Sequence, residues 1–374
     1  MKFIILQENL KSGLDIVEKI NIKSPSLPIL NCVLIKVEKN FLNLTTTNLE
    51  MAIQWFSLSK IEKEGSLVCP IKILSNFINI LPQKTISFFS QNKFLEIESE
   101  NYKTHLIYQN SEEFPIIPQI KNGESISFNS QNFCQSLNQV VGLTNPSTTR
   151  PEISGVYFVF EKNLLKMVAT DTFRLGEKTL KIEKPLLKNY SFILPQKTAR
   201  EVINIFGEEK GELTIYFNAN QVLFEIPMSE IAHPKIQLIS RLIEGDYPNY
   251  QEIIPKKYET QIILLKNEFL NQIKAASLFS NKLNEVKFKI NPSKNEINIF
   301  SQNPNLGEYQ SSLLGEIKGQ PLEISFNYRF LLDGLLNIKS SEVFFGLNTE
   351  EDPAILKPVA DQSYFYVVMP IKTS

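Results

Sequence analysis

Hydrophobic positions along this chain follow two spacings, one typical of strands and the other typical of helices. Residues 2–7 form a strand-like run, and residues 8–20 then place apolar side chains on one helical face. That face comprises Leu10, Leu14, Val17 and Ile20. Strand-like runs follow at 29–37, 41–46 and 51–58. The pattern therefore predicts a strand, a helix and then three strands.

The same order of elements returns along the whole chain. A strand at 66–70 and a helix beginning at Pro70 precede strand-like runs near 85–90, 93–98 and 103–109. The apolar face of that helix would comprise Ile73, Leu74, Phe77, Ile78 and Leu81. Further helices are predicted at 130–141, after 192–195, at 267–279 and after Phe326. Within a copy the two helices are about 60–65 residues apart, and copies begin about 120–135 residues apart. Three similar α+β domains are predicted, each made of two such units; three unrelated domains with a similar rhythm are the alternative.

Two segments have the composition of linkers between these copies. Residues 113–123 and 245–257 are rich in proline, glycine and polar side chains, which favours extended, semi-rigid connections. The predicted domains are therefore residues 1–122, 123–256 and 257–374.

Composition excludes several classes of protein. The chain has 374 residues, of which 43% are hydrophobic and 21% charged, so disorder is not expected. The longest apolar runs, such as 364–369, are much shorter than the roughly 20 residues of a membrane-spanning helix. The apolar stretch at residues 3–6 is too short for a signal peptide. We therefore expect a cytoplasmic protein.

The charge balance argues against tight binding of nucleic acid. There are 39 Lys and Arg residues against 40 Asp and Glu residues, giving a net charge of −1. Basic residues nevertheless recur on the predicted helices, at Lys11, Lys19, Lys72, Lys197, Arg200, Lys274, Arg329 and Lys339. If these helices share a face, it would contact phosphates without reading bases. Ordinary solvated lysines are the alternative.

The sequence lacks the common motifs of catalysis and cofactor binding. It has no phosphate-binding glycine loop, no paired cysteines and no nucleophile elbow, so we expect no cofactor, no metal and no enzymatic activity. The scattered Cys32, Cys69 and Cys134 are expected in the core. Asp171 is the best isolated candidate for a catalytic carboxylate, as in a hydrolase. A turn residue that binds backbone N–H groups is the more ordinary interpretation.

Several stretches, in order along the chain, are similar to the bacterial β sliding clamp family, the β subunit of DNA polymerase III. They are Ser26–Leu30, Thr47–Met51, Thr149–Val156, Ala169–Leu175, Ile243–Tyr250 and Tyr366–Ile371. The resemblance implies a three-domain clamp fold with helices facing the interior of a ring and sheets outside. It also implies a head-to-tail homodimer that encircles duplex DNA and acts as a non-catalytic processivity factor.

The resemblance further implies a pocket that binds short peptides of partner proteins. Its residues would be Ile153, Thr170, Arg174, Leu175, Pro248, Ile253, Val367, Met369, Pro370 and Ile371. Most are apolar, as expected of a groove for a linear motif. Core packing is the alternative for Ile153, Leu175 and Val367. Phe173 stands where relatives often have His or Tyr, which implies one hydrogen bond fewer.

Two other surfaces follow from the same resemblance. The DNA-facing residues would be Lys72, Lys197, Arg150, Arg200 and Lys274. Ser24 and Gln196 stand where relatives often have arginine, which implies weaker DNA contact. The dimer interface would include Leu106, Leu278 and Phe279.

The implied partners are proteins and duplex DNA. They are the DNA polymerase III alpha subunit, an ATP-using clamp-loader complex, and other polymerases and repair proteins with clamp-binding peptides. The alternatives are a repeat scaffold that binds proteins without DNA, and a hydrolase that uses Asp171.

Overall fold

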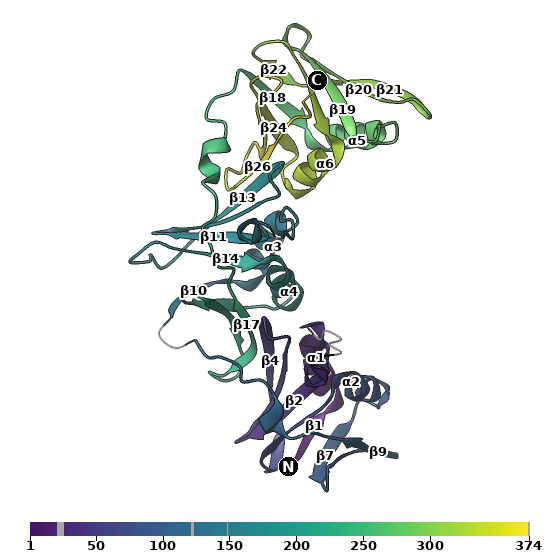
Figure 1. The fold of residues 1–374 in the computed structure, drawn as a ribbon, viewed down its shortest axis with the longest axis vertical. Coiled ribbons are helices and arrows are strands. Elements are labelled where there is room, and N and C mark those ends of the chain that lie inside the picture. The colour runs from purple at the N-terminus through teal and green to yellow at the C-terminus, as the bar shows by residue number, and fades with distance from the viewer. Residues whose placement is uncertain (21–25, 121–122, 148, 373–374) are drawn as a thin grey trace. The chain divides into compact units, whose positions relative to one another are not determined.

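The computed structural model describes residues 1–20, 26–120, 123–147 and 149–372. The chain divides into two compact units, each built from two separate stretches (Figure 1). Unit 1 comprises Met1–Gln135 and Lys197–Leu242, and unit 2 comprises Ser136–Gln196 and Ile243–Ser374. No helix among the described residues is long and apolar enough to cross a membrane.

Unit 1 contains two antiparallel sheets. The five-stranded sheet has the order β5 (Lys60–Lys63), β1 (Lys2–Leu6), β7 (Thr85–Gln91), β8 (Phe94–Ser99) and β9 (Tyr102–Ile107). The eight-stranded sheet has the order β10 (Glu124–Asn129), β15 (Glu212–Phe217), β16 (Gln221–Pro227), β17 (Pro234–Arg241), β4 (Met51–Leu58), β3 (Phe41–Thr47), β2 (Cys32–Glu38) and β6 (Gly65–Pro70). Pairing of β17 with β4 joins residues far apart in the sequence into one sheet.

Helices α1 (Gln7–Val17) and α2 (Ile71–Ile80) pack against each other and against these strands (Figure 1). The predicted apolar face of α1 is buried, with Leu10, Leu14 and Val17 at most 1% exposed. Gly13 lies against the Trp55 ring, where a Cβ atom would come within 2.4 Å. Helical spacing in the sequence thus identified the packed face correctly.

Unit 2 also contains two antiparallel sheets. The nine-stranded sheet has the order β14 (Tyr190–Pro195), β11 (Gly155–Glu161), β12 (Leu164–Thr170), β13 (Arg174–Lys181), β26 (Tyr364–Val368), β25 (Ala354–Pro358), β24 (Glu342–Leu347), β18 (Thr260–Leu265) and β22 (Glu316–Lys318). The four-stranded sheet has the order β21 (Gly307–Leu314), β20 (Glu296–Asn303), β19 (Glu285–Asn291) and β23 (Leu322–Asn327).

Helices α5 (Lys266–Ser277) and α6 (Tyr328–Asn337) pack against each other in unit 2 (Figure 1). Phe269 of α5 meets Phe288 of β19 and Phe345 of β24, with ring centroids 6.1 and 5.8 Å away, in a fully buried aromatic core. Helix α3 (Ser130–Val141) and helix α4 (Gln196–Phe206) each include residues of both units.

The α+β class and the repeated order of strand, helix and strands are confirmed, with three local differences. The strand predicted at 29–37 begins only at Cys32, because Pro28–Asn31 forms a 3-10 turn. The short β5 was not predicted. Ile73, assigned to the apolar face of its helix, is 55% exposed. The predicted domain boundaries stay a prediction.

Candidate functional site

The hairpin turn between β12 and β13 in unit 2 is fixed by its own side chains. Thr170 Oγ1 donates to the Arg174 carbonyl oxygen over 2.7 Å. Asp171 Oδ1 accepts from the N–H groups of Phe173 and Arg174, at 3.0 and 3.1 Å. Thr172 adopts a left-handed conformation with φ of 78°, which these hydrogen bonds support.

The second carboxylate oxygen of Asp171 holds the Arg174 side chain. Asp171 Oδ2 accepts from Arg174 Nε over 2.9 Å, and Asp333 of α6 accepts from Nη1. The guanidinium lies over the Phe330 ring, 4.6 Å from its centroid. Burial alone would lower the pKa of Arg174, but the neighbouring Tyr366, Asp333 and Asp171 outweigh it and raise that pKa. Arg174 is therefore a fixed, permanently charged group.

A close helix–strand contact places Phe330 and Asp333 beside this turn. The Tyr366 hydroxyl donates to the Phe330 carbonyl oxygen over 2.7 Å. At Gly334, a Cβ atom would lie 2.6 Å from the Tyr366 ring, so a larger residue would push α6 away from β26. Sequence reasoning missed Phe330 and Asp333. The glycine inside a helix, a costly residue there, was the available signal of close packing.

Sheet pairing brings the C-terminal candidates to the same turn. Leu175 of β13 pairs with Val367 of β26. Beyond β26, the Met369 N–H donates to the Phe173 carbonyl oxygen over 2.8 Å, and the Ile371 N–H donates to Ser325 over 2.8 Å. Pro370 lies between these two anchored positions.

Of the linker candidates, Pro248 precedes a short 3-10 turn, Tyr250–Ile253, and Ile253 is its last residue. Tyr250 packs in a buried cluster that also contains Val168, Leu175, Ile355 and Val367. The start of the linker lies beside the turn Pro151–Ile153, since a Cβ atom on Gly245 would be 3.7 Å from Glu152. The linker therefore covers the face of the sheet on which Leu175 and Val367 lie.

The ten candidates differ in how a ligand would reach them. Ile153, Leu175 and Val367 are 4%, 0% and 1% exposed, in agreement with the alternative that they belong to the core. Thr170 is also buried, at 9% exposed. Ile253 is 46% exposed, and the neighbouring Phe173, which was not among the ten, is 59% exposed. Half-buried candidates are Arg174, Pro248, Met369, Pro370 and Ile371. The assignment of these residues to a peptide pocket stays a prediction.

Asp171 has the structural role of a turn residue. Both of its oxygens accept hydrogen bonds within the turn, which leaves no oxygen oriented toward a substrate. Among the described residues, no group of three His, Cys, Asp or Glu side chains is arranged to hold a metal ion. Cys32, Cys69 and Cys134 are buried as predicted, and burial raises the pKa of the Cys134 thiol to about 12.

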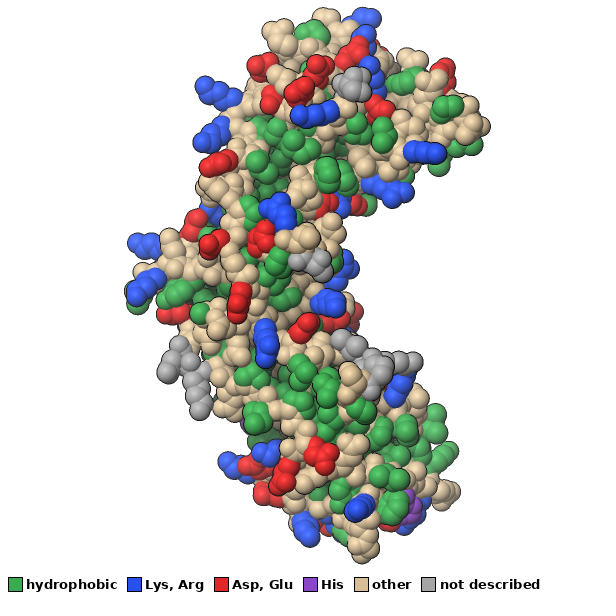
Figure 2. Space-filling view, in the orientation of Figure 1, with side chains coloured by type: hydrophobic (Ala, Val, Ile, Leu, Met, Phe, Trp, Pro, Cys, Tyr) green, Lys and Arg blue, Asp and Glu red, His purple; other side chains and the backbone are tan. Residues whose placement is uncertain are grey.

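The five predicted DNA-facing residues are all exposed. Arg150 Nε, however, lies 3.1 Å from Glu152 Oε1, so its charge is largely compensated. Within the described part of the chain, no ion pair involves Lys72, Lys197, Arg200 or Lys274. Figure 2 shows Lys and Arg side chains scattered among Asp and Glu side chains on the face in view. Ser24, noted above, lies outside the described residues.

The predicted interface residues lie at sheet edges. Leu106 is half-buried on β9, the outermost strand of its sheet in unit 1, and the adjacent Ile107 is 68% exposed. In unit 2, Leu278 is 70% exposed after α5, and the Phe279 ring stacks on Tyr309 of the edge strand β21.

Models of three protein domains match nearly the whole chain. They are the N-terminal, central and C-terminal domains of the DNA polymerase III beta subunit, which match residues 1–118, 127–249 and 251–372. The three-domain fold predicted from the repeat is therefore confirmed.

Individual relatives agree with this result. The beta sliding clamp of Bacillus subtilis (strain 168) is 27% identical over the full length of both chains, and that of Staphylococcus aureus (strain Mu50 / ATCC 700699) is 28% identical over 93% of each. The crystal structure of the Bacillus subtilis clamp matches with a TM-score of 0.94 at 26% identity, covering both chains completely. The DNA polymerase III subunit beta of Pseudomonas aeruginosa has the same fold, with a TM-score of 0.94 at 22% identity over both complete chains.

The matched domains, the relatives and the fold agree from one end of the chain to the other. The family they define is a non-catalytic subunit, which rules out the hydrolase interpretation of Asp171. This chain belongs to the DNA polymerase III beta subunit family, the sliding clamps.

Proposed function

We propose that two copies of this chain close head to tail into a ring around duplex DNA and act as the processivity factor of a replicative DNA polymerase. A ring is retained on DNA by topology, so high affinity is unnecessary and would hinder sliding. The near balance of 39 basic and 40 acidic residues suits this role. Contacts from Lys72, Lys197, Arg150, Arg200 and Lys274 would be few and independent of sequence.

The seam of the ring would join β9 of one copy to the region of β21 in the other. Both are edge strands of the sheets that the described residues form. Ile107, at the end of β9, and Leu278, next to the Phe279 ring that stacks on β21, are exposed apolar side chains. Pairing two different edges gives a heterologous interface, which closes into a ring only when the angle between copies permits it. Leu106, Leu278 and Phe279 would be buried there.

The partner-binding pocket is proposed around Arg174 in unit 2. The observation that carries this proposal is a fixed guanidinium whose turn also holds the exposed Phe173 and the half-buried Met369. The linker that covers the same face of the sheet carries the exposed Ile253. A peptide would place apolar side chains against Ile253, Met369 and Pro370, while Thr170 and Arg174 orient its polar groups.

The proposed partners are the DNA polymerase III alpha subunit, a clamp-loader complex that uses ATP, and other polymerases and repair proteins with clamp-binding peptides. We also propose a cytoplasmic location, and domain boundaries at 1–122, 123–256 and 257–374.

Titration with a peptide of the Gln-x-x-Leu-Phe type tests the pocket. Met369→Ala and Ile153→Ala should each weaken binding, by roughly tenfold for loss of a well-packed apolar contact. Leu49→Ala is the matched control, because Leu49 is 47% exposed on the corresponding turn of unit 1. Equal affinity of the wild type and both pocket variants would reject the pocket.

The ring is tested separately by small-angle X-ray scattering with the mass measured on the same eluting peak. A mass near twice 42.9 kDa, together with a distance distribution that has a central hole, is expected. A compact monomer would instead favour a scaffold that binds proteins without encircling DNA.

A further inference from the structure

A buried carboxyl group joins the sheet of unit 2 to the linker that carries Pro248 and Ile253. The Tyr250 hydroxyl donates to Glu177 Oε2 over 2.7 Å, and Glu177 is only 8% exposed on β13. Thr179 Oγ1 is 3.5 Å from the other carboxyl oxygen. A buried carboxyl group is costly unless it is hydrogen-bonded. The hydrogen bond from Tyr250 therefore offsets part of the cost of burying Glu177.

The linker is held mainly by side chains between two backbone anchors. Backbone N–H groups bond at each end, from Ile243 to the Ile193 carbonyl oxygen of β14 and from Glu259 to the Asn348 side chain. Between these anchors, the Tyr247 ring stacks on Tyr157 of β11 with centroids 4.5 Å apart. Tyr250 supplies the second contact to the sheet. The half-buried Pro248 and the exposed Ile253 therefore depend on two tyrosines for their position.

The surroundings of Glu177 contain few compensating charges. The charge of Lys166 on β12 acts on Glu177, but its Nζ lies 2.6 Å from Glu161 Oε1. Across the strands, Glu177 faces Phe365 of β26, which is apolar. Burial raises the pKa of Glu177, while the bonds from Tyr250 and Thr179 and the charge of Lys166 oppose that rise. The Tyr250 bond is consequently stronger when Glu177 is ionised.

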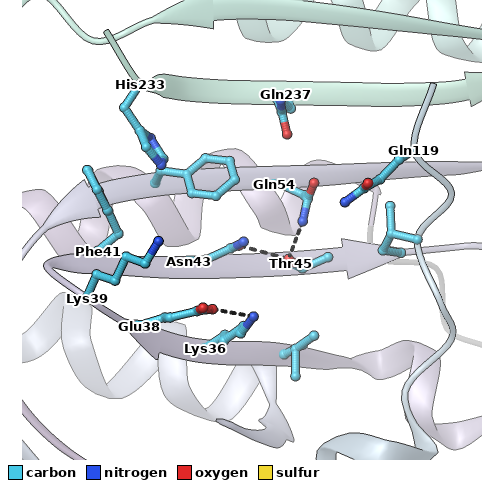
Figure 3. Close-up of a pocket in the computed structure, with 13 residues that line it drawn as sticks. Lys36, Glu38, Lys39, Phe41, Asn43, Thr45, Gln54, Gln119, His233 and Gln237 are labelled. Carbon is cyan, nitrogen blue, oxygen red and sulfur yellow. Dashed lines mark hydrogen bonds and ion pairs between the residues drawn. The ribbon is translucent and has the colours of Figure 1, made fainter. Parts of the chain in front are cut away.

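Among the described residues, the corresponding place in unit 1 has no such contact. Gln54 follows Met51 by three residues on β4, as Glu177 follows Arg174 on β13. Gln54 pairs with Gln237 of β17, and Glu177 pairs with Phe365 of β26. Gln54 lines an open hollow of about 420 Å³ together with Gln119 and Gln237 (Figure 3). The contact with a linker tyrosine is thus specific to the unit that carries the proposed pocket.

We infer that Glu177 and Tyr250 are positioning residues for the partner-peptide pocket, because their hydrogen bond fixes the wall formed by Pro248 and Ile253. This inference rests on the proposed function of that pocket. Neither side chain needs to touch the peptide. Without this hydrogen bond, Pro248 and Ile253 are less ordered in the free protein. Binding of a peptide must then order them, and that loss of entropy lowers the affinity.

Four variants test the inference by titration with the same Gln-x-x-Leu-Phe peptide. Tyr250→Phe keeps the ring and removes the hydroxyl, and should weaken binding about five- to tenfold, the net worth of one hydrogen bond. Glu177→Leu should weaken peptide binding by a similar factor. Glu177→Gln keeps an acceptor and should stay within about twofold of the wild type. Tyr216→Phe removes a Tyr–Glu contact of unit 1, 3.5 Å from Glu225, and should change nothing.

A pH series separates positioning from general destabilisation. The loss caused by Tyr250→Phe should grow as the pH rises and Glu177 ionises, and should be independent of pH in a Glu177→Gln background. Circular dichroism confirms that each variant is folded at the temperature of titration. A wild type that does not bind the peptide would overturn the proposed pocket itself. A wild type that binds, with Tyr250→Phe binding equally well at every pH, would overturn only the positioning role.

Discussion

The turns Thr47–Met51 in unit 1 and Thr170–Arg174 in unit 2 share one backbone design. Asn48 Oδ1 accepts from the N–H groups of Glu50 and Met51 at 3.0 and 2.8 Å, as Asp171 does in its own turn. Leu49 and Thr172 have nearly equal left-handed φ values of 74° and 78°. Both turns lead into a strand that pairs with a distant part of the chain.

The two turns differ in the side-chain contacts that they make. In unit 2, Asp171 has a second oxygen to hold Arg174, which also meets Asp333 and Phe330. In unit 1, the neutral Asn48 precedes Met51, which is 5% exposed and packs as an apolar residue.

The linkers differ as well. Tyr250 covers the sheet face in unit 2, whereas Phe114 of the first linker packs with Cys32 and Val68 and leaves Gln54 in an open hollow. The two units thus share a turn, while a few side chains and the linker distinguish the one that carries the candidate binding site.

Arg174→Met places the residue of unit 1 into the turn of unit 2. It leaves Asp171 and Asp333 without their cation, so we expect a loss of roughly 2–4 kcal/mol in unfolding free energy. Peptide binding should also be lost. Urea unfolding and peptide titration measure the two effects. Met51→Ala, the control in unit 1, should lower stability through a cavity and leave peptide affinity unchanged. If both variants impaired binding equally, the functional distinction between the turns would be wrong.

Asp171→Asn makes the turn of unit 2 resemble that of unit 1 more closely. The amide oxygen can still accept from Phe173 and Arg174, but the charge that holds the Arg174 side chain is lost. We expect a loss of about 1–2 kcal/mol in unfolding free energy, the contribution of one charge-assisted hydrogen bond. The reciprocal Asn48→Asp should change stability by less than about 0.5 kcal/mol, because a carboxylate oxygen can still accept from the N–H groups of Glu50 and Met51. A larger effect at Asn48 would contradict this account.

Glu177→Gln makes the sheet face of unit 2 resemble Gln54 in unit 1. The pKa of Glu177 is raised in the folded state, so its carboxyl group favours folding below its ordinary pKa and loses that contribution as the pH rises through the raised value. The glutamine variant should therefore gain stability relative to the wild type between mildly acidic and neutral pH. Melting temperatures measured across that range check the sign, and a difference that is constant with pH would contradict it.

Substitutions of basic residues should have smaller effects, on the salt dependence of DNA binding. Lys197→Ala and Arg200→Ala in unit 1 remove charges that form no ion pair with another described residue. Each should reduce the salt dependence of DNA binding by roughly 0.9 in slope per lost phosphate contact. Arg150→Ala in unit 2 should reduce it less, because Glu152 already compensates that charge. Binding to duplex DNA at several salt concentrations measures these slopes. Equal slopes for all three variants would contradict the smaller effect expected for Arg150→Ala.

Some features of the site could be read from local sequence. Thr170, Asp171 and Arg174 form a turn whose hydrogen bonds join residues close together in the sequence. A turn of this kind can be predicted from a short sequence motif. Asp171 was correctly recognised as a possible turn residue. Ile73 was misplaced because helical spacing identifies a broad face but not its exposed margin.

The sequence by itself determined the strand and helix order, the repeat and, by resemblance, the family, because these depend on periodicity and on short motifs. Only the tertiary structure decided which distant side chains meet Arg174 and Glu177. Asp333 and Phe330 reach the turn because Gly334 lets α6 approach Tyr366, and Tyr250 reaches Glu177 because a linker folds back over the sheet. Contacts between residues 73 to 159 positions apart leave no periodic pattern in the sequence, since they depend on how whole elements pack.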